Sequence, residues 1–257
     1  MINKYFANPK YNGVAVFLLM LALISYLAPT RNEQVKITYS YPATVCPAVI
    51  SNANAIAALP NSKIGKRLID GKIKKFSPAN ASSLTLGTKS ILIDGNAGTS
   101  LTFVNNGWKA VVPCSVSNGE QWFVGGSGAI TSKSILSIVN SGFSESSVEI
   151  EVFTPNAALE AKQVAIAPNS TKSISVDTLA PGEDSLVIAV KTKSGRVSSF
   201  LFDERKKGLR SLGADYVAPV SAPRKIITIP AISDLQGKAA VAGTSSTHSL
   251  RLLIPVS

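Results

Sequence analysis

The feature that most constrains the fold is a series of short apolar segments, separated by turn residues, between Gln121 and Asp203. The clearest segment is 148–153, in which apolar residues alternate with Glu149 and Glu151. A period of two is typical of a strand with one buried face. About seven such segments recur at intervals of about 8–13 residues, and no helical pattern interrupts them. We therefore predict an all-β chain built on an immunoglobulin-like antiparallel β-sandwich, and a parallel α/β sheet is disfavoured.

The N-terminus predicts where the protein resides. Residues 1–13 are basic, and 14–28 form an uncharged apolar run, the pattern of a secretory signal. Tyr26 and Pro29 are unfavourable around a cleavage site after Ala28. We therefore favour an uncleaved signal-anchor, a single transmembrane helix at 14–28 in the cytoplasmic membrane with the bulk of the chain outside. Secretion after signal cleavage is the main alternative. This alternative is supported by the length of the run, which is shorter than the ~20 residues of a membrane-spanning helix. A buried core helix is a third interpretation.

The two cysteines, Cys46 and Cys114, both lie in the exported part. Two cysteines in an oxidising compartment indicate one disulfide, and two unpaired buried thiols are the alternative. Closing so long a loop would stabilise the fold by roughly 4 kcal/mol. No metal site is predicted, because two thiols and the single His248 do not provide the usual four zinc ligands.

The domain organisation follows from these signals. The region before the strand series is mixed but mainly β, and the residues after it are rich in proline. Two further strand-like segments, 225–230 and 250–255, either pair with the earlier sheets or begin a truncated second domain. In chain order the predicted parts are a cytoplasmic n-region (1–13), the membrane helix (14–28), a tether (29–45), a mixed, mainly β region (46–120), the immunoglobulin-like sandwich (121–215) and a connector with two strands (216–257).

The charge balance is basic, with a net charge of +11 and a pI of about 9.7. A basic surface outside the cell would attract an anionic wall polymer or lipid headgroups. A solvated basic face without a partner is the alternative, and another envelope protein is a further possible partner. Nucleic acid is not expected, because no aromatic stacking platform accompanies the charges. The candidate anion-binding residues are Lys63, Lys66, Arg67, Lys72, Lys74 and Lys75 in one cluster and Arg205, Lys206, Lys207 and Arg210 in another.

Candidate catalytic motifs are weak, and we predict no catalytic residue and no cofactor. Ser127 lies in a glycine-rich stretch, but Ala129 stands where a nucleophile elbow needs glycine. Glu149 and Glu151 share one face of a strand, where they would solubilise the sheet. A wall-glycan hydrolase is the enzymatic alternative, and it would need two carboxylates facing each other across a cleft, ~5–10 Å apart.

Several motifs, in their order, resemble an uncharacterised family of exported actinobacterial proteins described only as a domain of unknown function. The motifs are Cys46-Pro47, Cys114, Trp122-Phe-Val-Gly-Gly-Ser127, Leu136-Ser-Ile-Val-Asn140, Val148-x-Ile-x-Val152, Ala180-Pro-Gly182 and Gly208-Leu-x-x-Leu-Gly213. The similarity would extend from about Cys46 to Pro255. It implies no catalytic residues, and it implies a short member, because relatives usually carry a second β domain.

Together these observations predict a non-catalytic, exported cell-envelope protein, a binding or scaffolding module whose basic faces meet anionic envelope components. A degenerate module without present activity is the second alternative to this function, beside the hydrolase.

Overall fold

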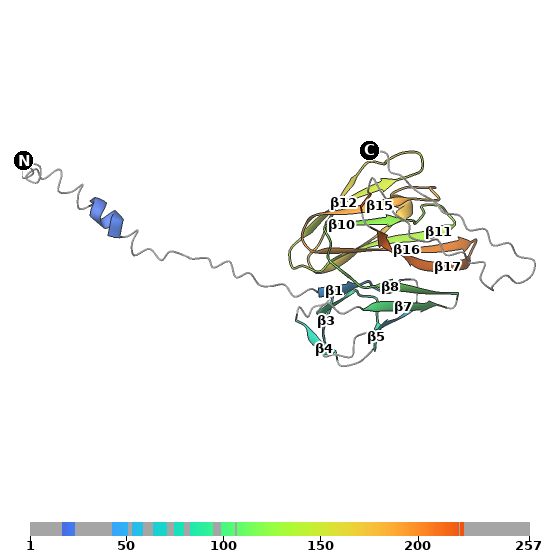
Figure 1. Ribbon diagram of the computed structural model, residues 1–257, viewed down its shortest axis with the longest axis horizontal. Helices are drawn as coiled ribbons and strands as arrows, with labels where there is room; N and C mark the ends of the chain where they lie inside the picture. The colour runs from blue at the N-terminus through green and yellow to red at the C-terminus, as the bar shows by residue number, and fades with distance from the viewer. Residues whose placement is uncertain are drawn as a thin grey trace, which may run out of the picture. The chain divides into compact units, whose positions relative to one another are not determined.

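The computed structural model describes residues 17–23, 43–50, 53–58, 64–70, 75–79, 83–94, 99–105, 107–220 and 222–223. The chain divides into two units, 1–40 and 41–257. In the first unit the described residues, 17–23, are helical. All of the strands among the described residues lie in the second unit (Figure 1). The strand-like segments 225–230 and 250–255 lie outside the described residues.

The first half of the second unit forms two antiparallel sheets. One sheet has the order β4-β3-β6-β1-β9, with β1 Ala43–Cys46, β3 Ile64–Leu68, β4 Ser77–Ala79, β6 Ile91–Asp94 and β9 Ser115–Val116. The other has the order β5-β2-β7-β8, with β2 Asn54–Ala58, β5 Ser83–Leu86, β7 Ser100–Asn105 and β8 Trp108–Pro113.

The second half forms two more antiparallel sheets. One has the order β13-β12-β15-β10-β18, with β10 Glu120–Val124, β12 Ser146–Phe153, β13 Lys162–Ile166, β15 Val187–Ser194 and β18 Pro219–Val220. The other has the order β14-β11-β16-β17, with β11 Ser132–Asn140, β14 Ser170–Ser175, β16 Val197–Lys207 and β17 Arg210–Val217. A short 3₁₀ helix, η1 Val176–Thr178, follows β14.

The prediction of a nearly all-β chain is confirmed, but the predicted immunoglobulin-like sandwich is wrong. The four sheets are arranged as a four-bladed β-propeller. A sandwich has two sheets, each with one buried face, whereas the central strands β11 and β16 of the sheet β14-β11-β16-β17 are buried on both faces. Leu136 and Leu201 from this sheet join one hydrophobic cluster, while Val139 and Phe202 join another.

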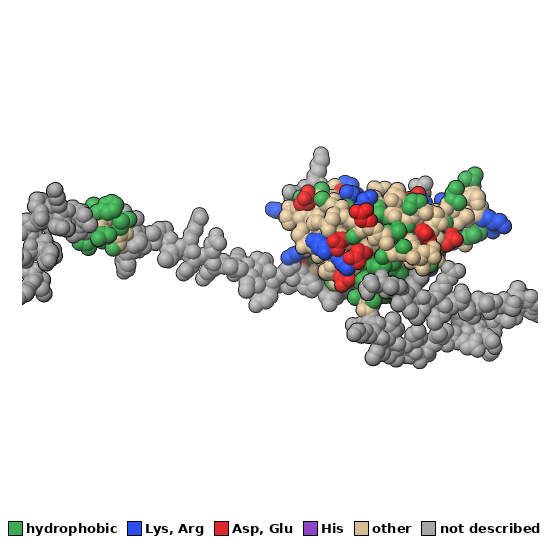
Figure 2. Space-filling view, turned by 90° about the horizontal axis from the view of Figure 1, so that it is seen from above, with side chains coloured by type: hydrophobic (Ala, Val, Ile, Leu, Met, Phe, Trp, Pro, Cys, Tyr) green, Lys and Arg blue, Asp and Glu red, His purple; other side chains and the backbone are tan. Residues whose placement is uncertain are grey.

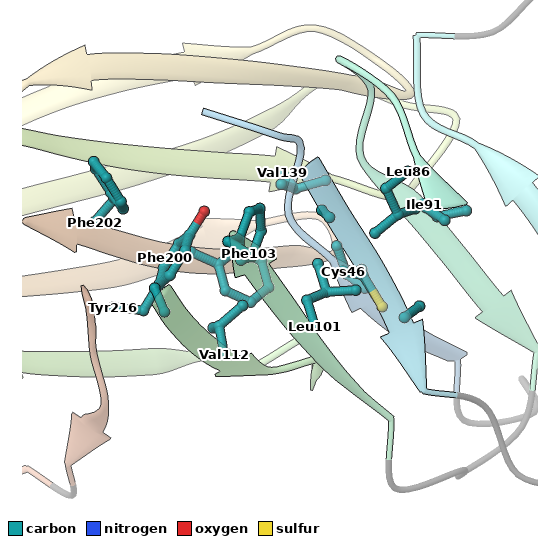
Figure 3. Close-up of a cluster of buried hydrophobic side chains, with 14 of the residues drawn as sticks. Cys46, Leu86, Ile91, Leu101, Phe103, Val112, Val139, Phe200, Phe202 and Tyr216 are labelled. Atoms are coloured by element: carbon teal, nitrogen blue, oxygen red, sulfur yellow. The ribbon is translucent and has the colours of Figure 1, made fainter. Parts of the chain in front are cut away.

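The cluster that contains Val139 and Phe202 joins the two halves of the second unit. Phe200, Phe202 and Tyr216 from β16 and β17 pack with Phe103 and Val112 from β7 and β8 (Figure 3). The ring of Tyr216 lies between Phe103 and Phe202, with centroid distances of 5.1 and 5.4 Å. At about 25 cal/mol per Å² of apolar surface, burial of such large side chains is the main force that holds the sheets together.

The predicted disulfide is confirmed: Cys46 at the end of β1 is bonded to Cys114, just before β9, across a sequence separation of 68. Both strands belong to one sheet, where β1 also pairs with β9. The bond therefore closes a loop that contains most of the first two sheets. A disulfide of this kind indicates an oxidising, extracytoplasmic environment.

The predicted transmembrane signal-anchor at 14–28 needs correction. In the described part of the chain no helix is long and apolar enough to cross a membrane. Of the predicted segment the structure describes residues 17–23, which are helical, and the rest of 14–28 lies outside the described residues.

Candidate functional site

The basic cluster predicted at 63–75 does not form one exposed surface, because Arg67 points inward. Only 3% of Arg67 is exposed, and burial lowers the pKa of its guanidinium. The guanidinium donates hydrogen bonds to the side-chain oxygen of Asn169 and, over 2.8 Å, to the carbonyl oxygen of Ser141. It also lies 4.6 Å from the ring centroid of Phe143 and 5.9 Å from that of Phe76. Arg67 is thus occupied within the fold and is not available to an anionic polymer.

The other members of this cluster are scattered or undescribed. Lys66 is half-buried on β3, and Lys75 is exposed just before β4. Lys63, Lys72 and Lys74 lie outside the described residues.

The second predicted cluster does come together, on the hairpin formed by β16 and β17. In the register of this hairpin Lys207 is opposite Arg210, and Lys206 is opposite Ser211. Gly208, at φ +61°, allows the tight turn between the strands. We call residues 205–212, together with Ile130 in the adjoining turn before β11, the hairpin tip.

Charge is separated along this hairpin. Asp203 pairs with Arg205 over 2.9 Å, and Glu204 lies 3.8 Å from Lys206. Both carboxylates precede the tip on β16, next to β11. Asp203 also accepts hydrogen bonds from the hydroxyls of Ser132 and Ser134 on β11. Lys207 and Arg210 are exposed and form no ion pair with any residue the structure describes. The outermost part of the hairpin therefore carries uncompensated positive charge.

Three large aliphatic side chains accompany these cations. Leu209 is 106% exposed at the turn, Leu212 is 60% exposed, and Ile130, in the turn before β11, is 99% exposed. The Lys206 amide donates to the carbonyl oxygen of Thr131 over 2.7 Å, which holds the Ile130 turn against the hairpin. The hairpin reaches one end of the second unit (Figure 1), and at that end hydrophobic and basic side chains project together (Figure 2).

These aliphatic residues are not among the predicted site residues, because that prediction rested on charge alone. A signal was present: Leu209 follows Gly208 between two apolar segments, with Lys206, Lys207 and Arg210 close by. The turn needs glycine only at 208, so the local conformation does not require an apolar residue at 209.

The candidate catalytic residues have structural roles in the described part of the chain. The Ser127 side chain is buried, donates to the carbonyl oxygen of Glu183 and accepts from the Ala129 amide. Glu149 pairs with Lys193 over 2.9 Å, and Glu151 pairs with Lys191 over 2.6 Å. His248 lies outside the described residues, and among described residues no group of three or more histidines, cysteines or carboxylates could hold a metal.

The pair of glutamates lies on the outer face of the sheet β13-β12-β15-β10-β18. On the face that Figure 2 shows, acidic and basic side chains are mixed, so no large field of one sign forms there. The hydrogen bond to Glu151 raises the pKa of Lys191. Trp122 and Trp108 are both buried, and Trp122 stacks on Phe153 with a centroid distance of 5.7 Å.

One small pocket lies between the two halves of the second unit. Its volume is about 70 Å³, which is room for a few water molecules and not for a sugar or a peptide. Val111, Phe123 and Phe200 line it, together with Ser199 and Tyr216, each of which carries a hydroxyl. Neither hydroxyl has a hydrogen-bond partner among the described residues.

Comparison with known proteins gives a family without an assigned activity. A model described as a family of unknown function (DUF5719) matches residues 81–256. No curated protein and no solved structure matches the chain. The matched range includes β16, β17 and the hairpin tip, but not Cys46 or Arg67.

Proposed function

The chain belongs to the family of unknown function DUF5719, and from that premise we propose that it is a non-catalytic cell-envelope module that binds or scaffolds anionic envelope components outside the cytoplasm. The observation that supports this function best is the hairpin tip. There Lys207 and Arg210 are exposed without a described acidic partner, so their charge is available to an anionic ligand.

Two further observations support an envelope role. The Cys46–Cys114 disulfide fits a protein that works outside the cytoplasm. The motif order that begins with Cys46-Pro47 supports a relationship to exported actinobacterial proteins, which we propose as the source group. The glutamates that a glycan hydrolase could use, Glu149 and Glu151, are each paired with a lysine on an open sheet face.

The proposal is tested by sedimentation of the oxidised protein with purified anionic cell-wall polymer and, separately, with anionic vesicles, across a salt series. Electrostatic capture predicts co-sedimentation that decreases steeply with salt, because surface charges are screened beyond about 10 Å at 0.1 M. The double variant Lys207→Gln/Arg210→Gln is expected to bind several-fold more weakly.

A matched control is the double variant Lys162→Gln/Arg196→Gln, which removes the same charge from exposed positions outside the hairpin tip. Equal weakening by both pairs would show a response to net charge alone. No co-sedimentation with either partner would overturn the proposal.

A further inference from the structure

The hairpin tip combines two features that a soluble polymer does not require together. Its cations explain attraction to any anion, but Leu209, Leu212 and Ile130 present hydrocarbon directly to solvent. The side chain of Leu209 is fully exposed, so it contributes nothing to the packing of the fold. The turn itself needs only the positive φ of Gly208, and a polar residue at 209 would serve as well.

We propose that the hairpin tip is a docking site for an anionic lipid surface, in which the three aliphatic side chains enter the headgroup boundary and the cations contact lipid phosphates. This deepens the proposed function and rests on it, because it names lipid as the anionic partner. Insertion of aliphatic side chains beside lysine and arginine is how peripheral segments bind the interface of anionic membranes.

The position of each residue suits this role. Lys207 and Arg210 are paired directly across the turn that carries Leu209, and both are exposed. The long stems of these side chains let their charged ends stay at the phosphates while the leucine enters the apolar layer. The carboxylates of Asp203 and Glu204, which phosphates would repel, are paired with cations further along the hairpin.

The hairpin is also braced against bending at the surface. β16 pairs with β11 from Val197 to Arg205, and its edge continues into the contact between Lys206 and Thr131. The side opposite the tip leads into the aromatic cluster around Phe202 and Tyr216. A tip held on such a base does not lose much conformational entropy when it binds.

The test places a fluorescent reporter at the tip of the full-length, oxidised protein through the substitution Leu209→Trp. A matched control, Val104→Trp, places the same reporter at an exposed position on another sheet. Both native tryptophans are buried, so quenching reports mainly on the introduced one. The probes are vesicles of phosphatidylglycerol with phosphatidylcholine, vesicles of phosphatidylcholine alone, and both kinds with brominated acyl chains.

Docking predicts that the emission of the Leu209→Trp variant shifts to shorter wavelength and is quenched by brominated acyl chains on the anionic vesicles only, while Val104→Trp is unaffected. In the reporter background, Lys207→Gln and Arg210→Gln are each expected to weaken vesicle binding about fivefold. The further variant Leu212→Ser/Ile130→Ser is expected to reduce the emission shift while the purified protein keeps its melting temperature.

A reporter at 209 that is neither shifted nor quenched while the protein co-sediments with vesicles would overturn the lipid site, because another part of the chain then binds them. Binding to wall polymer that needs Lys207 and Arg210, without any response at 209, would also overturn it but leave the proposed function standing. Failure to bind either polymer or vesicles would remove both.

Discussion

The Arg67 guanidinium donates a hydrogen bond to the main-chain carbonyl oxygen of Ser141, 2.8 Å away and 74 residues further along the chain. The same side chain reaches Asn169 and lies against Phe143. Arg67, from the first half of the second unit, therefore binds a loop and a turn of the second half. A buried charge needs hydrogen-bond partners, and the two Nη atoms have them, whereas Nε has none among the described residues.

The first prediction concerns this contact. Arg67→Ala removes two charge-assisted hydrogen bonds and a cation–π contact, and it leaves the Ser141 carbonyl without that donor. We expect a loss of about 2–4 kcal/mol in the free energy of unfolding, measured by urea denaturation. The control is Lys66→Ala, on the same strand but half-buried, for which a loss under about 1 kcal/mol is expected. Equal losses for both variants would contradict the assignment.

The disulfide gives a second prediction. Reduction, or the pair Cys46→Ala/Cys114→Ala, should destabilise the fold by about 4 kcal/mol, since a long loop gains entropy in the unfolded chain. The measurement is the midpoint of guanidinium denaturation with and without reductant. Because Cys46 is fully buried, its alanine variant also loses packing, so reduction of the unmodified protein is the cleaner comparison. An unchanged midpoint would show that the bond adds no stability.

From the burial of Tyr216 we predict how the free energy of unfolding changes at alkaline pH. Burial raises the pKa of its phenol far above the usual value near 10, so the folded state keeps the proton while the unfolded state releases it. The contribution of this phenol to the free energy of unfolding is therefore fully present below pH ~10. Above that pH it falls by up to about 1.4 kcal/mol per pH unit. Tyr216→Phe should flatten that fall.

The measurement is thermal unfolding of wild type and Tyr216→Phe at pH 8 and at steps above pH 10. At pH 8 the two should agree to within about 1 kcal/mol, because the hydroxyl has no described hydrogen-bond partner to lose. Lys191, whose pKa is also raised, loses its charge in both proteins and cancels in the comparison. Parallel curves above pH 10 would show that the phenol ionises in the folded state.

The local pattern of strands could be read from the sequence, but the number of sheets could not. Alternation over 148–153 predicts one buried face, and β12 has that pattern. By contrast, nearly every residue of 135–139 and 197–202 is buried, because other sheets pack on both faces of β11 and β16. A pattern of period two has no information about what packs on the second face, so a two-sheet sandwich was the natural but wrong conclusion.

Only part of the candidate site could be predicted from the sequence, because a sequence pattern does not show which residues pack together. Charge is visible in a sequence, so the cations of the hairpin tip could be found, but burial is a tertiary property. Arg67 is therefore indistinguishable from its neighbours until its partners Ser141 and Asn169 are brought near it. The strand β2, Asn54–Ala58, is a similar case: alanine is a strong helix former, yet in this alanine-rich strand Ala55 and Ala57 are buried in the core.

The glycine-rich stretch around Ser127 yields the last prediction, because its role is steric. A Cβ on Gly128 would lie 1.8 Å from the carbonyl oxygen of Ala180, a main-chain atom that cannot turn aside. The Gly128 amide also donates to Glu183 over 2.8 Å, and its carbonyl accepts from Gly182 over 3.0 Å. Gly128→Ala must push these two loops apart, and we expect a loss of about 2–4 kcal/mol or failure to fold.

The matched control is Gly119→Ala, where a Cβ would meet nothing within 4 Å and the expected change is under about 1 kcal/mol. Ser127→Ala separates sterics from chemistry: it removes the hydroxyl that accepts from Ala129 and donates to Glu183, at an expected cost of about 1–2 kcal/mol. Urea denaturation of the three variants gives the order Gly128→Ala, Ser127→Ala, Gly119→Ala from most to least destabilised. If Gly128→Ala were as stable as Gly119→Ala, the close approach of the loops would not exist in solution.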